Sequence, residues 1–152
     1  MILAVDIEGT RWLADVGFGG DTLLDPIPFD DDQPIRQGGW AFQLVEEADV
    51  RVLRGLRSDG WLDLYAFTEE RQLPVDYEVA NHFTSTWPRS PFVTKIVVQR
   101  SGVDERWMMI ADELWVERPG GEERWPIASP EERLSILADR FGLVFPDGTR
   151  FE

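Results

Sequence analysis

An aspartate followed at once by a glycine-rich turn is the part of this sequence best suited to chemistry. Asp15 closes an apolar run, and Gly17, Phe18, Gly19 and Gly20 come directly after it. A carboxylate at the end of an apolar strand is partly buried, so it needs hydrogen bonds or a cationic partner. Two interpretations follow: Asp15 caps the turn through backbone N–H groups, or it orients a histidine as the carboxylate of a catalytic triad.

The glycines of this turn allow positive φ angles and a close approach of another group to the backbone. Their N–H groups could also form a concave site for an anion. The Lys-Ser/Thr pair that follows the glycines of a phosphate-binding P-loop is missing here. The turn by itself is therefore a weak signal for any particular ligand.

A second polar stretch, residues 81–92, reads NHFTSTWPRSPF and concentrates hydroxyl and amide side chains. These side chains are Asn81, Thr84, Ser85, Thr86 and Ser90, and Phe83 and Arg89 lie among them. Hydroxyls, an aromatic face and an arginine suit a nucleotide with phosphates. The alternative is ordinary capping at the C-terminus of a helix. The single histidine, His82, is expected to be a packed or surface residue rather than a catalyst.

The composition excludes several classes of function. The net charge is −14, from 29 acidic and 15 basic residues, and this argues against nucleic acid and anionic membranes as partners. There are no cysteines, which excludes a disulfide scaffold, a thiolate metal site and a cysteine nucleophile within this chain. With one histidine, a zinc cluster is not expected, and we predict no metal.

The sequence also bears on where the protein is located. No apolar run approaches the length of a membrane span. The first ten residues lack the basic leader and the small-residue cleavage site of a signal peptide, so we expect a cytoplasmic protein. The chain begins inside a strand pattern, and we interpret this start as a cut within a longer polypeptide.

The elements that must position these residues can be read from their patterns. Strands are predicted at 1–7 and 11–16 around a tight turn, followed by a loop over 21–39. Strands at 40–47, 50–56 and 61–70 continue an antiparallel meander typical of a small barrel. This part should give way to a helix and a second sheet near residues 72–90.

The second half is predicted to mix helices and strands. A helix of about ten residues should run from Pro74 and end before Pro88. A strand at 92–100 and two or three more within 105–127 should follow. Ser129 is a predicted N-cap, and its helix should stop at Gly142.

Four stretches together resemble the arylamine N-acetyltransferase family. They are RWLADVGFGG at 11–20, PIPF at 26–29, LPVDYEVANHFTSTWPRSPF at 73–92 and SPEERLSILADRFGL at 129–143. Family members have a helical N-terminal domain, a β-barrel domain and an α/β lid. The resemblance implies an α+β chain with the β-barrel domain over 1–73, and an interdomain helix and α/β lid with a second small sheet over 74–152.

The resemblance also implies a chemistry. Family enzymes use a Cys-His-Asp triad to take an acetyl group from acetyl-CoA and pass it to an arylamine, hydrazine or N-hydroxyarylamine. Asp15 corresponds to the triad aspartate, and Phe18 with Gly17 to the acceptor-binding turn. The residues expected at the CoA channel are Gly19, Gly20, Phe83, Arg89 and Ser90. Trp87 stands where family members often have histidine, so individual contacts in that segment are open.

Two triad members have no counterpart in the chain. It contains no cysteine, and the triad histidine would fall at or just before Met1. We therefore expect the C-terminal part of an arylamine N-acetyltransferase that lacks its N-terminal domain and is inactive alone. The alternatives are a non-catalytic CoA-binding module, a subunit that completes an active site with a partner, and an amide synthase of the same fold.

Overall fold

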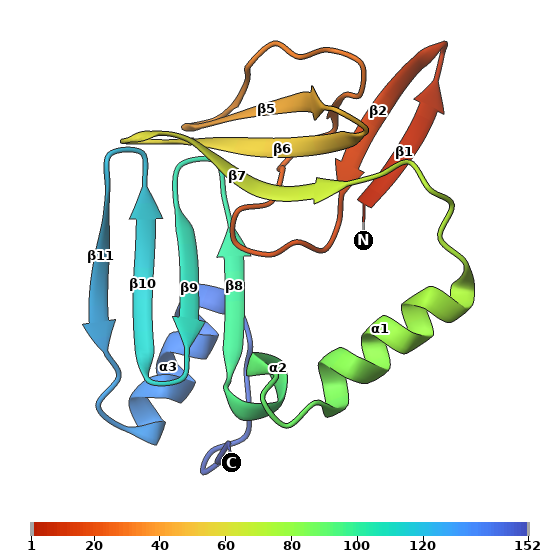
Figure 1. The fold of residues 1–152 in the computed structure, drawn as a ribbon. Coiled ribbons are helices and arrows are strands. Elements are labelled where there is room, and N and C mark those ends of the chain that lie inside the picture. The colour runs from red at the N-terminus through yellow and green to blue at the C-terminus, as the bar shows by residue number, and fades with distance from the viewer. Residues whose placement is uncertain (1, 152) are drawn as a thin grey trace. The chain divides into compact units, whose positions relative to one another are not determined.

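The computed structural model describes residues 2–151, so the first residue of the first predicted strand lies outside the described residues. The described residues form eleven strands and three helices, which confirms the α+β class (Figure 1). They divide into two compact units. The first comprises the chain up to Glu69 with Ser101–Arg106 and Glu117–Gly121, and the second comprises the remainder. The domain boundary between residues 73 and 74 stays a prediction.

The first unit begins with the predicted hairpin, β1 (Ile2–Ile7) and β2 (Thr10–Asp15). Glu8 and Gly9 between the strands have φ angles of 52° and 83°. Positive φ at both central residues matches the twist of the flanking strands in a two-residue hairpin. The local sequence EGT is therefore sufficient to place this turn.

A four-stranded antiparallel sheet follows in the same unit, in the order β4-β5-β6-β7. Its strands are β4 (Ile35–Gln37), β5 (Trp40–Glu47), β6 (Val50–Arg57) and β7 (Gly60–Phe67). The last three confirm the predicted meander.

The prediction of an unbroken loop over 21–39 is wrong. This stretch contains β3 (Ile27–Pro28), which pairs with β2, and also β4. Strands of two and three residues are too short to show the alternation of apolar and polar residues by which a strand is recognised. Only pairing with a neighbouring strand defines them.

One hydrophobic core serves both sheets of the first unit. It contains Leu13 from β2 and Ile27 from β3, together with Phe42 and Leu53 from the larger sheet, and all four are fully buried. Leu13 is also next but one before Asp15 in β2. The core therefore fixes the strand that carries the candidate carboxylate.

The other face of the β1–β2 hairpin is apolar and exposed. Successive strand residues point to opposite faces, and in the hairpin register Ala4 lies opposite the buried Leu13. Leu3, Val5 and Ile7 therefore lie on the face away from the core, where they are 38–55% exposed. Among residues 2–151 this face is largely uncovered.

The second unit begins with α1 (Pro74–Thr86), the predicted helix. It ends where Trp87, with ψ of 122°, precedes Pro88, as expected for a residue before proline. The predicted strand over 92–100 is only partly correct, because α2 (Pro91–Thr94) occupies its start and β8 (Val97–Ser101) its end. A proline at the first helical position favours a helical turn there over an extended strand.

The remaining strands form a four-stranded sheet in the order β11-β10-β9-β8. β9 (Arg106–Ile110), β10 (Glu113–Arg118) and β11 (Gly121–Pro126) are joined by short turns, and Figure 1 shows that consecutive strands run in opposite directions. This confirms the predicted second sheet.

The last helix, α3 (Pro130–Phe141), has both predicted ends. Ser129 Oγ accepts the N–H of Glu132 at 3.1 Å, and Gly142 adopts a left-handed φ of 70°. Leu137 of this helix is buried with Met109 and Val116 of the sheet in a separate core. Among residues 2–151 no helix is both long and apolar enough to cross a membrane.

Candidate functional site

Asp15 is the last residue of β2, and its two carboxylate oxygens have different surroundings. Oδ1 accepts the N–H groups of Gly17 at 3.0 Å and of Phe18 at 3.1 Å. Oδ2 is buried and has no hydrogen-bond partner among residues 2–151. Buried polar atoms are nearly always paired, so an unpaired one calls for an explanation. Asp15 caps its turn with one oxygen and keeps the other available as an acceptor.

Tyr65 of β7 lies beside this carboxylate, and sequence reasoning did not find it. Its ring centroid is 4.7 Å from that of Phe18, and its hydroxyl is buried without a partner among the described residues. Burial, then the negative charge of Asp15 and the polar contact of the hydroxyl with that carboxylate, raise the pKa of Tyr65 above its ordinary value, although the two groups do not meet the distance and angle of a hydrogen bond. Tyr65 therefore remains a neutral hydroxyl donor over the physiological range.

The glycine turn is closed by its own backbone. Gly19 has a φ of 114°, which strongly favours glycine. Its carbonyl accepts the N–H of Thr22 at 3.1 Å, and Thr22 Oγ1 lies 3.5 Å from the carbonyl oxygen of Asp15. Gly20 is buried, whereas Phe18 remains 44% exposed. The first unit thus brings Asp15, Gly17 and Phe18 together in one short segment.

The residues of the second unit that were predicted to bind CoA lie close together at the end of α1. The rings of Phe83 and Trp87 stack with centroids 5.1 Å apart, and the Arg89 guanidinium lies 4.8 Å from the Trp87 centroid. Ser90 follows and is 3% exposed. No carboxylate within residues 2–151 pairs with Arg89, although the chain is strongly acidic. An arginine on an aromatic face without an acidic partner can receive a phosphate.

The hydroxyl side chains of the same stretch are committed to the helix itself. Thr84, Ser85 and Thr86 each donate to the carbonyl oxygen four residues earlier, at distances of 2.6–2.9 Å. These protons point back along the helix rather than toward solvent. These three hydroxyls are therefore already engaged, whereas the aromatic pair and Arg89 have no hydrogen bond of this kind within residues 2–151.

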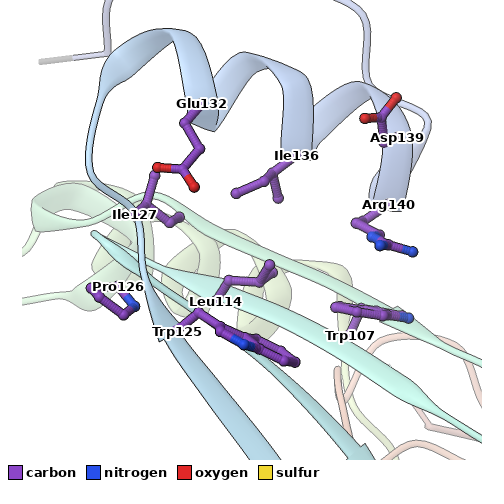
Figure 2. Close-up of a pocket in the computed structure, with 9 residues that line it drawn as sticks. All are labelled: Trp107, Leu114, Trp125, Pro126, Ile127, Glu132, Ile136, Asp139 and Arg140. Atoms are coloured by element: carbon purple, nitrogen blue, oxygen red, sulfur yellow. The ribbon is translucent and has the colours of Figure 1, made fainter.

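A cavity of about 400 Å³ lies between α3 and the sheet of the second unit, as Figure 2 shows. Trp107 forms part of its floor, stacked on Trp125 with centroids 6.2 Å apart, and Arg140 lies 4.6 Å from the Trp107 centroid. None of the residues predicted from the sequence lines this cavity. Its walls come from β9, β10, β11 and α3, so no single stretch of sequence indicates it.

Comparison with known proteins supports the family resemblance. A family model described as N-acetyltransferase matches residues 1–149. The arylamine N-acetyltransferase of Mycobacterium tuberculosis (strain ATCC 25618 / H37Rv) is 32% identical over 140 residues, which are 92% of this chain and 50% of that protein. This chain therefore spans about half the length of the curated relative.

Solved structures give the same result. The Mycobacterium smegmatis arylamine N-acetyltransferase superposes with a TM-score of 0.85 at 33% identity, covering 93% of this chain and 53% of that one. The Mycobacterium marinum enzyme, solved in complex with CoA, superposes with a TM-score of 0.83 at 33% identity and the same coverage. With the family model matching nearly every residue, the chain belongs to the arylamine N-acetyltransferase family.

Proposed function

We propose that this chain supplies the triad aspartate of an arylamine N-acetyltransferase, with Asp15 orienting a histidine contributed from outside these residues. The observation that carries the proposal is the buried, unpartnered Oδ2 beside an Oδ1 held by Gly17 and Phe18. Because the turn fixes the rotation of the carboxylate, Oδ2 has a defined direction. Such an oxygen accepts an imidazole N–H, selects the tautomer and stabilises the imidazolium.

The thiol of the reaction must also come from outside these residues, because the chain contains no cysteine. In the complete site, the thiolate attacks the thioester carbonyl of acetyl-CoA, the C–S bond to CoA breaks, and the imidazolium protonates the CoA thiolate that leaves. The amine nitrogen then attacks the acetylated thiol and loses a proton to the imidazole, and the C–S bond breaks to release the amide and the enzyme thiolate. The chain alone is therefore proposed to be inactive, with Asp15 acting only through the absent histidine.

The acceptor amine is proposed to bind against Phe18. This ring is 44% exposed and packs on Tyr65, so one face is held while the other is open. Aromatic rings associate in offset or edge-to-face contacts of this kind. Gly17, Gly19 and Gly20 leave the backbone bare, which allows the thioester of the donor to pass close to the turn.

CoA is proposed to be held by the residues at the end of α1. Arg89 has no acidic partner among the described residues and suits a phosphate group, and Phe83, which stacks on Trp87 and is 56% exposed, offers an aromatic face to a base. Ser90 begins the short α2 turn beside them. The CoA complex of the Mycobacterium marinum relative supports this assignment of the donor.

The exposed apolar face of β1 supports a further segment in the working enzyme. Leu3, Val5 and Ile7 lie on one side of the hairpin and remain 38–55% exposed among the described residues. We propose that the helical domain missing from this chain covers it and brings the cysteine and histidine. The chain alone should therefore associate with itself, which light scattering over a concentration series would detect.

The test is a measurement of free CoA thiol released from acetyl-CoA in the presence of aniline. For the chain alone, which has no cysteine, a thiol reagent reports CoA only, and for a fusion the thiol signal measured without acetyl-CoA is subtracted. The chain by itself should show no release above buffer. A fusion that places upstream of it the part of the Mycobacterium tuberculosis relative outside the match should release CoA, and Asp15→Asn should abolish this.

Two results would overturn the proposal. The first is turnover by the 152-residue chain alone that depends on Asp15. The second is a fusion whose rate is unchanged by Asp15→Asn. CoA binding to the chain by calorimetry, lost in Arg89→Ala, together with an inactive fusion would favour the non-catalytic CoA-binding module. An amide synthase would give an active fusion that rejects aniline and accepts an amine within a larger substrate.

A further inference from the structure

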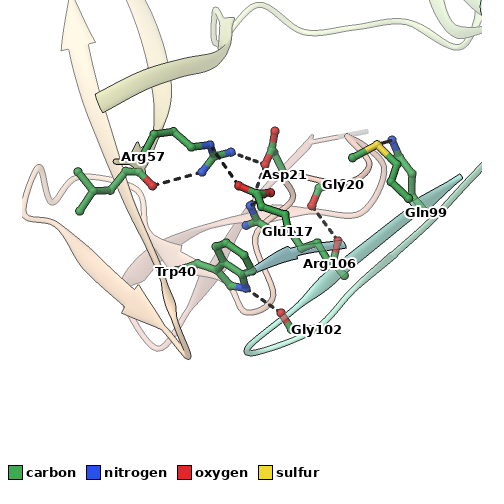
Figure 3. A network of polar contacts seen from close by, with 11 residues as sticks. Gly20, Asp21, Trp40, Arg57, Gln99, Gly102, Arg106 and Glu117 are labelled. Atoms are coloured by element: carbon green, nitrogen blue, oxygen red, sulfur yellow. Dashed lines mark hydrogen bonds and ion pairs between the residues drawn. The ribbon is translucent and has the colours of Figure 1, made fainter. Parts of the chain in front are cut away.

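A cluster of two arginines and two carboxylates lies directly after the glycine turn, in the first unit (Figure 3). Arg106 Nη1 donates to Asp21 Oδ1 at 2.7 Å, and Arg57 Nη2 donates to the same oxygen. Glu117 completes the cluster at 3.6 Å from both Arg57 Nε and Arg106 Nη1. The four formal charges cancel.

Arg106 is the buried member of the cluster. Its side chain is 1% exposed, and its guanidinium carbon lies 3.8 Å from the ring centroid of Trp40. Nε and Nη2 of Arg106 have no partner among residues 2–151. Burial lowers the pKa of Arg106, and Asp21 and Glu117 act against this change. A cation buried in this way depends on its carboxylates, so the Asp21 contact is not an interchangeable surface pair.

The tryptophan beneath Arg106 is itself fixed. Trp40 is buried, and its Nε1–H donates to the carbonyl oxygen of Gly102 at 2.8 Å. Ser101, next to Gly102, donates its hydroxyl to the carbonyl oxygen of Gly20 at 2.9 Å. The short Ser101–Arg106 segment therefore contacts the end of the glycine turn at Gly20 and, through Arg106, at Asp21.

The glycine turn is consequently held at both of its ends. At its start, Asp15 Oδ1 accepts the N–H groups of Gly17 and Phe18. At its end, Gly20 and Asp21 are fixed by Ser101 and by the two arginines. Only a few residues separate Asp21 from Phe18. A displacement of Asp21 would therefore also move Phe18 and the Asp15 carboxylate that the Phe18 N–H helps to orient.

We propose that Asp21, held by Arg106 and Arg57, is the positioning residue that sets the direction of Asp15 Oδ2 and of the Phe18 ring. Asp21 acts through the turn and not on a substrate. The expected effect of Asp21 on catalysis rests on the proposed function. Its expected effect on the conformation of the turn does not. The competing explanation is that the cluster only stabilises the unit as a whole.

The first test uses the 152-residue chain and reads the turn directly. Amide hydrogen exchange of Gly17 and Phe18 is measured by NMR, and global stability is measured by urea unfolding. Asp21→Asn removes the charge but keeps the shape, and it should speed exchange at both amides by about tenfold beyond any change in global stability. Asp21→Glu keeps the charge and should restore part of the protection.

Asp63→Asn is the matched control. Asp63 of β7 also pairs with an arginine, accepting from Arg54 Nε at 2.7 Å in the same unit, but it is not part of the turn. Exchange at Gly17 and Phe18 should stay within about twofold of wild type in this variant, since distant and independent sites are close to additive. Unchanged exchange in folded Asp21→Asn would overturn the inference. If that variant does not fold, unchanged exchange in Arg57→Gln, which removes the charge paired with Asp21, would overturn it equally.

The second test uses the fused enzyme described above. Asp21→Asn should lower kcat by about tenfold with little change in the KM for acetyl-CoA, because a small misplacement of an orienting group costs reaction rate. Asp63→Asn should leave both constants unchanged. If exchange responds to Asp21 but the wild-type fusion is inactive, the inference stands and the proposed function fails. If the fusion is active while Asp21→Asn alters neither exchange nor kcat, the inference fails and the proposed function stands.

Discussion

The glycine turn after β2 and the aromatic residues with Arg89 at the end of α1 are both predicted to contact ligands, but they differ in burial. At the turn, Asp15 Oδ2 and the Tyr65 hydroxyl are buried without partners among the described residues. At the end of α1, Phe83 is 56% exposed, and the neighbouring hydroxyls donate within the helix. The first region orients single atoms, whereas the second offers an exposed aromatic and cationic surface.

The difference has an energetic origin. A buried polar atom left unpaired costs about 1–3 kcal/mol, so the surrounding structure must compensate for it. The first unit does so with the core around Leu13 and with the charges that hold Asp21. The α1 segment has no buried residue, so it has little with which to compensate such a cost. We therefore expect the turn to orient catalytic groups and the end of α1 to bind a ligand through side chains that can still change conformation.

The largest expected effect is at Asp15. In the fused enzyme, Asp15→Asn should lower the rate of CoA release by about 10³- to 10⁴-fold, because an amide does not stabilise the imidazolium. Initial rates with aniline measure this, and Asp63→Asn serves as the unaffected control. A loss below tenfold would mean that the turn caps a strand without contributing to a triad.

The next comparison concerns packing in the two regions. Leu53→Ala removes a fully buried core side chain and should lower the free energy of unfolding by about 2–5 kcal/mol. Val79→Ala in α1, where Val79 is 65% exposed, should change it by less than about 0.5 kcal/mol. Urea unfolding followed by circular dichroism gives both values. Similar losses in the two variants would show that α1 is packed against another surface in solution.

A smaller effect is expected at Arg89. Arg89→Ala should raise the KM for acetyl-CoA in the fused enzyme by about tenfold, the effect of losing one charge-assisted contact to a phosphate. The kcat should change little, and Arg89→Lys should recover part of the affinity. A fall in kcat at constant KM would instead place Arg89 in the orienting machinery and would remove the contrast between the two regions.

The smallest effect is the pH dependence due to Tyr65. Burial and the charge of Asp15 raise the pKa of Tyr65 in the folded state, so the unfolded chain releases this proton at lower pH. The contribution of Tyr65 to stability is complete below the ordinary tyrosine pKa of about 10 and decreases as the pH rises above it. Wild type should therefore lose more stability than Tyr65→Phe in urea melts above that pH. Parallel losses would contradict the burial of this hydroxyl.

The predictions that succeeded depend on short stretches of sequence. The EGT turn, the Ser129 cap and the Gly142 stop each need only a few adjacent residues, and the structure confirms all three. The β3 and β4 pairings were missed because strands this short show no alternation, and the helical start of 91–94 was missed because its β-branched residues favoured a strand over the signal of Pro91. In those segments the neighbouring strands or the proline position outweigh intrinsic preference.

The amino-acid sequence alone determined the family resemblance, the α+β class, the absence of a thiol and the presence of a carboxylate before a glycine turn. Only the tertiary structure decided that one oxygen of Asp15 accepts two N–H groups of the turn and that the other is buried without a hydrogen bond of good geometry. It also brought Tyr65 to that carboxylate and Arg106 to Asp21. The physical reason is that local patterns specify turns, caps and strands, whereas burial and pairing arise from packing between residues far apart in the chain.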